Sequence, residues 1–308
     1  MNWITSIETA VEYIENNLLS RLDYENIAAC AYCSSHHFQR MFSVFSGYTL
    51  GEYIRARRMT LAGAELKGSD IKILDLAIKY GYENPESFTR AFTKFHGITP
   101  SQARKTDSQL KSFSRLSNYE SDEGGNLLDY RIIDIDRQIF IGCKTHFEGT
   151  PYSEERRDQE EELFLSTRNM QWMLKGMSAA SSDSFNESLD YCIIDNFEDE
   201  GYDFYYAQPM NKLSLLDDIT IKQFHVDKIS LPKATYAVFE TKSERYPTES
   251  YIKMCRQIFC EWLPSTNYQL LSGPELIIYH WYNDRKEDRY IEVYIPVKLE
   301  NEDCSIGI

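Results

Sequence analysis

The segment FQRMFSVFSGYT at residues 38–49 is matched fifty residues later by FTRAFTKFHGIT at residues 88–99. Identical residues recur at this constant offset, among them Arg40, Phe42, Phe45, Gly47 and Thr49, which correspond to Arg90, Phe92, Phe95, Gly97 and Thr99. In each copy the phenylalanines have helical spacing, and a glycine follows where such a helix would end. The repeat predicts a duplicated supersecondary unit with two short helices in each copy.

The residues around the repeat predict the other helices of this part. Asp23 is a candidate N-cap for the first short helix, and Ser34 is a candidate N-cap for the second. Gly81 is expected to form the turn inside the second copy. Residues 50–67 predict one long helix that connects the two copies and fixes the distance between them.

The second helix of each copy is predicted to present hydrogen-bonding side chains outward, as a helix in the DNA major groove requires. These side chains are His36, Gln39, Arg40 and Ser43 in the first copy and Ser87, Thr89 and Arg90 in the second. If the two helices lie about one DNA turn apart, roughly 34 Å, both meet the major groove on one side of a duplex. Double-stranded promoter DNA is therefore the predicted partner.

The charge is divided unevenly along the chain. Residues 1–110 contain 12 basic and 12 acidic residues, whereas residues 111–308 contain 21 basic and 36 acidic ones, so the net charge of -15 belongs to the second part. Three arginines on the long helix, Arg55, Arg57 and Arg58, are open to two interpretations. They either contact phosphate or form a solvated helix face.

The cysteines and the hydropathy pattern indicate a compartment. No run of about 18 apolar residues predicts a membrane span, and the N-terminus lacks the layout of a secretory signal. The seven cysteines follow no disulfide framework, so we expect a cytoplasmic, nucleoid-associated protein. Cys30 and Cys33 form a CxxC pair that either begins a zinc site or simply places one residue in a helix and one in a turn. Because no second half follows, we predict no metal and no cofactor.

The second part of the chain predicts a different fold. Residues 107–126 are rich in serine, acidic residues and glycine and predict a linker after a domain at 1–106. From residue 127 to 308, strand-like segments are expected at 130–135, 139–145, 191–194, 203–209, 234–240, 276–282 and 289–297. Helices are expected at 154–173 and 249–263. This order predicts an α+β domain with internal pseudo-symmetry.

Aromatic residues are concentrated in this acidic part. It contains fifteen of the 22 tyrosines and three of the four tryptophans. Aromatic faces and carboxylates together suit a hydrophobic cation, because rings supply cation–π contacts and an acid supplies the counter-charge. The alternative is that each ring is an ordinary core residue.

The first part resembles the AraC/XylS family of transcription regulators. The resemblance covers about residues 1–105, and its most specific segment is GYENPESFTRAFTKFHGITPSQAR at 81–104; HHFQRMF with GEYIRARRM is similar to the Rob, MarA and SoxS branch. It implies a seven-helix double helix-turn-helix domain that binds an asymmetric DNA site as a monomer, with RNA polymerase as a further partner. His36 replaces a tryptophan of that branch, and Pro85-Glu86 replaces a glutamine pair.

The second part resembles a GyrI-like effector-binding domain, on the motifs KATYAVFE (233–240), EWLPSTNYQL (261–270), GPELIIYHWYN (273–283) and IEVYIPV (291–297). The resemblance implies a small-molecule groove between two halves, with an acid on the last strand that corresponds here to Glu292. The candidate walls of the groove are Tyr279, Trp281, Tyr206 and Tyr236.

Three functions are thus considered, in order of preference. The first is a regulator, specifically an activator, whose second domain binds a small hydrophobic or cationic effector. The second is a regulator whose acidic domain is a ligand-free protein-contact surface. The third is a GyrI-like hydrolase with Glu292 as general base; because the chain shows no Ser-His-Asp set, no phosphate loop and no metal cluster, we predict that it is not an enzyme.

Overall fold

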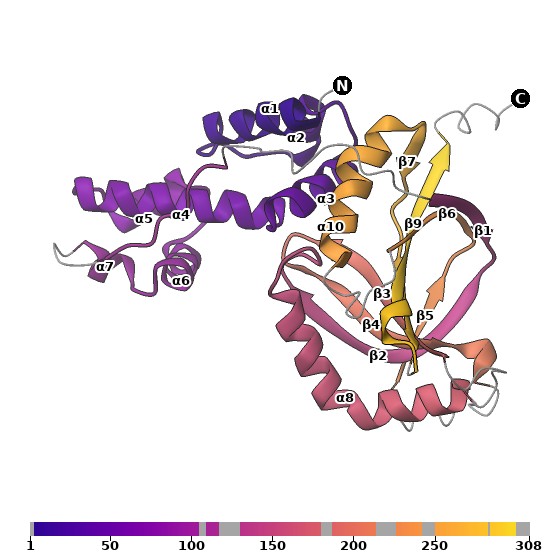
Figure 1. Cartoon of the computed structure of the whole chain (residues 1–308). Coiled ribbons are helices and arrows are strands. Elements are labelled where there is room, and N and C mark those ends of the chain that lie inside the picture. The colour runs from indigo at the N-terminus through magenta and orange to yellow at the C-terminus, as the bar shows by residue number, and fades with distance from the viewer. Residues whose placement is uncertain are drawn as a thin grey trace, which may run out of the picture. The chain divides into compact units, whose positions relative to one another are not determined.

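The computed structural model describes residues 3–104, 109–116, 130–179, 187–213, 226–241, 250–282 and 284–299. Two compact units divide the chain: residues 1–42 with 48–122, and residues 123–308 with the short stretch 43–47. The first unit is helical and the second is built on one sheet, as expected for an all-α domain followed by an α+β domain (Figure 1). In the described residues, no helix is long and apolar enough to cross a membrane.

Seven helices form the first unit in its described part: α1 Trp3–Asn16, α2 Tyr24–Cys30, α3 Ser35–Ser46, α4 Leu50–Gly68, α5 Ile73–Lys79, α6 Pro85–His96 and α7 Pro100–Ala103. The predicted caps are confirmed, because the Asp23 side chain accepts from the backbone of Glu25 and Ser34 Oγ accepts from the backbone of His37 at 3.2 Å. Gly97 ends α6 in the left-handed conformation at φ 79°.

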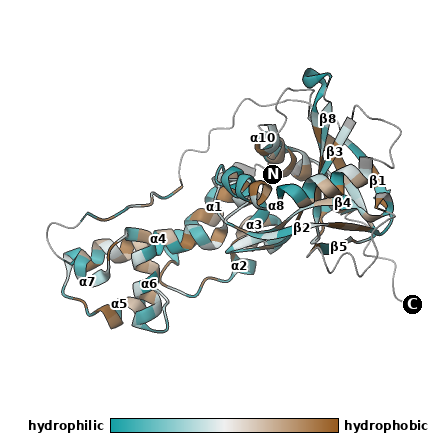
Figure 2. Ribbon diagram, turned by 90° about the horizontal axis from the view of Figure 1, so that it is seen from below, coloured by the Kyte–Doolittle hydropathy of each residue, from teal (hydrophilic) through white to brown (hydrophobic). Residues whose placement is uncertain are grey.

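Helix α4 is the shared core element of the two repeats. Hydrophobic and hydrophilic residues are interspersed along it (Figure 2), because it buries side chains on more than one side. Near its start Tyr53 is fully buried, and its ring lies 5.5 Å from that of Phe42 on α3. Near its end Met59 and Leu66 pack with Phe88 and Phe92 of α6. Each repeat therefore closes its core on a different part of one rigid helix.

The segment 109–116 lies within the predicted linker, but the structure packs it against the helical unit. Leu110 joins the core cluster of the second repeat. The Phe113 ring lies 5.0 Å from that of Tyr48, and its backbone N–H donates to Thr60 Oγ1 at 2.9 Å. These residues of the predicted linker therefore pack on the helical unit, because two apolar side chains in a polar segment gain stability by burial. The rest of the predicted linker lies outside the described residues.

Antiparallel strands form one sheet in the second unit. Its order is β1-β6-β9-β8-β3-β4-β2-β5, and β7 adds to β9. The strands are β1 Tyr130–Ile135, β2 Gln138–Glu148, β3 Glu187–Glu198, β4 Gly201–Pro209, β5 Asp227–Leu231, β6 Ala234–Glu240, β7 Tyr268–Leu270, β8 Glu275–Tyr282 and β9 Tyr290–Leu299. Helix α8 spans Arg156–Ala179, and α10 spans Ser250–Gln257 before a π-helical turn at Ile258–Trp262. The sequence missed β5 and β7.

The strand order contains the predicted pseudo-symmetry. If β1, β2, β3 and β4 are exchanged with β5, β6, β8 and β9, the order reads the same in reverse. Each half therefore gives its first strand to the other half: β1 pairs with β6, and β5 pairs with β2.

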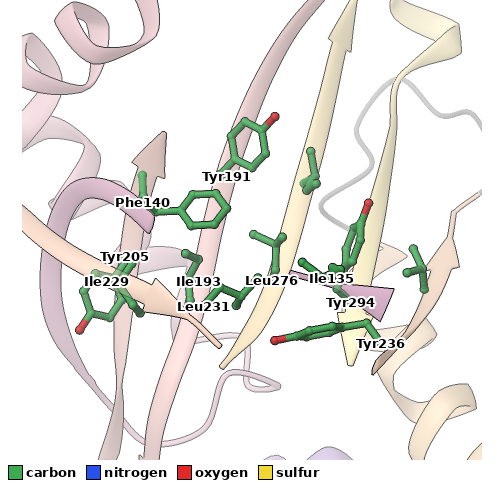
Figure 3. Packing of buried hydrophobic residues seen from close by; sticks show 13 residues of the cluster. Ile135, Phe140, Tyr191, Ile193, Tyr205, Ile229, Leu231, Tyr236, Leu276 and Tyr294 are labelled. Carbon is green, nitrogen blue, oxygen red and sulfur yellow. The ribbon is translucent and has the colours of Figure 1, made fainter. Parts of the chain in front are cut away.

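The two faces of the sheet have different roles. On one face a core cluster includes Phe140, Tyr191, Tyr236 and Tyr294, whose side chains come from both halves (Figure 3). The opposite face is covered by α8 and α10, which lie on the same side of the sheet (Figure 1). The sheet thus separates an internal apolar core from a helix-covered layer.

Candidate functional sites

Helix α6 exposes one of the three side chains that the sequence predicted on its outward face, Arg90. Asn84 caps the helix by accepting from the backbone of Ser87 at 2.9 Å. Arg90 and Lys94 are exposed one turn apart, while Ser87 and Thr89 are half-buried. The Ser87 hydroxyl donates to the Asn84 backbone carbonyl at 3.0 Å, so it takes part in the cap. Arg90 and Lys94 are thus the basic side chains that this helix exposes.

Helix α3 carries the other predicted DNA-contacting side chains. His36 and Gln39 are half-buried, and Gln39 Nε2 donates to Ser35 Oγ at 3.2 Å. The outward placement of Arg40 and Ser43 stays a prediction, because residues 43–47 group with the second unit and not with the rest of the helical unit.

The arginines of α4 have structural contacts. Arg57 forms a two-atom contact with Glu15 of α1, with both N···O distances at 2.8 Å, and Tyr53 donates to the same carboxylate. Arg58 donates to the backbone carbonyls of Leu18 and Ser20 at 2.8 Å. For Arg57 and Arg58 both earlier interpretations are therefore wrong, because these side chains attach α4 to α1 and the residues that follow it. Cys30 ends α2 and Cys33 lies in the next turn.

Three of the predicted effector residues lie together beneath α8. Tyr206 pairs with Cys192 across β4 and β3, and Tyr279 pairs with Asp190 across β8 and β3. With Trp281 they line a cavity of about 150 Å³, partly open to solvent, whose other walls are Glu160, Leu163, Phe164, Gln171, Asp190, Cys192 and Phe204.

The walls of this cavity combine aromatic rings with two carboxylates. The Tyr279 and Trp281 rings stack with centroids 5.8 Å apart and 5° between planes. Glu160 forms an ion pair with Arg156 at 2.6 Å, and Asp190 forms one with Lys175 at 2.5 Å. Burial, together with the carboxylate of Asp190, raises the pKa of Tyr206, so its phenol stays protonated. Sequence reasoning missed Glu160 and Asp190, although the acidic run DQEEE at 158–162 was a visible signal.

Glu292 lies on the other face of the sheet. It pairs with Ile278, whereas Tyr279 pairs with Ile291, and successive residues of a strand point to opposite faces. His280 Nε2 lies 3.0 Å from the Glu292 carboxylate and Tyr294 donates to it at 3.1 Å; Arg131 also contacts it. Burial would raise the pKa of Glu292, but the hydrogen bonds from His280 and Arg131 outweigh burial and lower the pKa to about 2. A carboxylate of this pKa is a weak general base.

Tyr236 shares the face of Glu292, since it pairs with Pro296 on β9. It is fully buried in the core cluster that spans both halves. The five predicted effector residues are therefore not one site: Tyr206, Tyr279 and Trp281 line the cavity, while Glu292 and Tyr236 belong to the opposite face.

The comparisons with known proteins match each part separately. Residues 27–106 match the family model of a helix-turn-helix domain, and residues 147–297 match that of an integron-associated effector binding protein. MarA of Escherichia coli K12 is 37% identical over 118 residues, which are 38% of this chain and 93% of MarA. The right origin-binding protein of the same strain is 38% identical over 94 residues, which are 30% of this chain and 32% of that protein.

A solved structure of SAV2435 bound to tetraphenylphosphonium covers 56% of this chain and 94% of that chain, at 17% identity and a TM-score of 0.41. From the near full-length match to MarA, the chain belongs to the AraC family of DNA-binding transcription regulators, and a GyrI-like α+β domain follows the DNA-binding one. The HTH-type transcriptional activator AarP of Providencia stuartii is 38% identical over 101 residues, which are 33% of this chain and 75% of AarP.

Proposed function

We propose that this AraC-type regulator is an activator whose cavity beneath α8 binds a hydrophobic organic cation. The observation that supports it is the meeting of Tyr206, Tyr279 and Trp281 with the carboxylates of Glu160 and Asp190 in one partly open cavity. Aromatic faces attract a cation through their quadrupoles, and a partly desolvated acid adds a strong counter-charge. An uncharged or anionic ligand gains neither.

A matched pair of probes tests this proposal. Tetraphenylphosphonium and tetraphenylborate have the same four-phenyl shape and opposite charges. Calorimetric titration of the full chain is expected to show binding of the cation at least tenfold tighter than binding of the anion. Equal affinities, or no binding of either ion, would contradict a cation site.

Two variants on one helix locate the bound cation. Glu160 lines the cavity, whereas Glu162 is exposed outside it. Glu160→Gln is expected to weaken tetraphenylphosphonium binding about tenfold, while Glu162→Gln, which removes the same charge from the same helix, changes it less than twofold. An equal loss in both variants would mean that only the general acidity of α8 attracts the cation.

The DNA-binding side of the proposal assigns base or phosphate contacts to Arg90 and Ser87-Thr89 of α6 and to His36 and Gln39 of α3. Arg40 and Ser43 of α3 are proposed to contribute as well. Activation is proposed to require contact with RNA polymerase. Transcription from a cognate promoter in a purified system, with and without tetraphenylphosphonium, tests the activator role, and a fall in transcript on adding the regulator would contradict it.

A second candidate function is a protein-contact surface with no ligand. One observation favours it: both cavity acids already have a basic partner, Arg156 or Lys175. The titration with tetraphenylphosphonium distinguishes the two candidate functions, because a surface without a ligand site would show no saturable binding of the cation.

A further inference from the structure

Arg156 is a buried cation at the first residue of α8, and its surroundings connect the cavity to α10. Its side chain is 6% exposed. Nε donates to Glu160 Oε1 at 2.6 Å and Nη1 donates to the backbone carbonyl of Pro151 at 3.2 Å. Among the described residues, Glu160 is the one carboxylate that forms an ion pair with Arg156.

Aromatic rings from two elements enclose the same guanidinium. Its Cζ lies 4.4 Å from the ring centre of Tyr251 on α10 and 5.4 Å from that of Phe204 on β4. Tyr251 in turn stacks on Tyr152, with centroids 6.4 Å apart. Arg156 therefore contacts a wall residue of the cavity on one side and the helix of the other pseudo-symmetric half on the other.

A buried arginine needs its carboxylate. Removing one partner of a desolvated ion pair leaves an uncompensated charge, which costs several kcal/mol. A cation that enters the cavity and uses Glu160 as its counter-charge must therefore share that carboxylate with Arg156. Because Tyr251 holds the guanidinium from the α10 side, any shift of Arg156 changes the contact that positions the start of α10.

We propose that Arg156 is the residue through which the cavity regulates α10: an effector cation competes with Arg156 for Glu160, and the displaced guanidinium loosens α10 through Tyr251. This inference rests on the proposed cation site. The proposed competition predicts a direction of change in effector affinity that a purely structural role of Arg156 would not produce. Removing the arginine must strengthen effector binding, because the competing charge is gone.

The first test measures tetraphenylphosphonium binding to the full-length protein. Arg156→Gln is expected to bind the cation about tenfold more tightly than the wild type, while Arg156→Lys, which keeps the charge, stays within about twofold. Weaker or unchanged binding by a folded Arg156→Gln protein would overturn the proposal and leave the cation site standing. If the wild type binds no cation, the proposed function fails and this inference fails with it.

The second test measures hydrogen exchange in α10 directly and does not use the Arg156 variants. Hydrogen exchange of amides 250–262 is expected to become at least threefold faster when tetraphenylphosphonium saturates the wild type. Tyr251→Leu should keep cation binding and lose this response, whereas Tyr251→Phe, which keeps the ring, should retain it. Saturation with no change of exchange in the wild type would overturn the coupling while the cation site remains.

Discussion

Tyr279 and Glu292 lie on neighbouring hydrogen-bonded strands but on opposite faces of the sheet. One of them borders the cavity beneath α8, and the other is held by His280, Tyr294 and Arg131. The proposed effector binding and the acid-dependent stability therefore depend on different residues, so we expect that the two properties can be changed independently.

Glu292→Gln is expected to leave tetraphenylphosphonium affinity within about twofold, because its carboxylate is on the other face from the cavity. Tyr279→Leu should weaken binding at least fivefold by removing a wall and a stacking partner of Trp281. Titration of both variants under one set of conditions checks this. A loss of binding in Glu292→Gln with Tyr279→Leu unaffected would place the effector on the face of Glu292.

The stability of the protein is expected to depend on Glu292 in acid. The pKa of this group is depressed to about 2 in the folded chain from an ordinary 4.5. Its contribution is therefore complete above about pH 5 and is lost as the pH falls toward 2, with a size of roughly 1–3 kcal/mol. Urea unfolding of wild type and Glu292→Gln is measured at several pH values from 7 to 3. The two free energies of unfolding should differ at neutral pH and approach each other in acid. A gap that stays constant over this range would show that the charge of Glu292 is not responsible.

The partly buried ion pair between Arg57 and Glu15 should matter more than an exposed one. Arg57 and Glu15 are 12% and 11% exposed, whereas Lys79 and Glu65 are 41% and 25% exposed. Glu15→Ala is expected to lower the free energy of unfolding by about 2–4 kcal/mol, since it removes the carboxylate that accepts from both Arg57 and Tyr53. Lys79→Ala should cost less than about 1 kcal/mol. Similar losses in both variants, measured by urea unfolding, would contradict the structural role given to Arg57.

Segment 109–116 is expected to stabilise the DNA-binding unit. Phe113 is half-buried against Tyr48 and Tyr53, so Phe113→Ala should cost about 1–2 kcal/mol. Ser114→Ala, at the exposed next position, is the control and should change little. Equal stability of wild type and Phe113→Ala would mean that the segment is only a tether.

Arg90 is expected to contact DNA directly. Arg90→Ala should weaken binding to the cognate promoter by about 1–3 kcal/mol if the guanidinium recognises a guanine, with a smaller loss on random DNA. Lys94→Ala should weaken both sequences alike and reduce the salt dependence, as a phosphate contact does. Titrations at two salt concentrations distinguish the two roles, and an unchanged affinity in Arg90→Ala would remove α6 as a base-contacting helix.

Local signals in the sequence were enough to predict most of the helices and strands. The ends of β1 and β6 match the prediction, and the caps at Asp23 and Ser34 form as expected, because each depends on neighbours within a few residues. β5 and β7 were missed, since DKISL and YQL are too short to show a period.

The sequence did not predict contacts between residues that are far apart in the chain. Alternation along IEVYIPV separates Glu292 from Ile291, but it gives no indication that Arg131, 161 positions earlier, is its partner. The cavity acids were missed because Glu160 lies on a helix and Asp190 on a strand, and only the fold brings them together.

The exchange of first strands between the halves bears on ancestry and assembly. A polypeptide limited to residues 130–213 would contain β1 without its neighbour β6, and β2 would have an open outer edge where β5 now lies. Two such polypeptides could pair their open strand edges by the same reciprocal exchange of first strands. A half-size ancestor is therefore expected to have been an intertwined homodimer, which gene fusion later made permanent. Analytical ultracentrifugation of that fragment would reveal a dimer, and a well-folded monomer would argue against this origin.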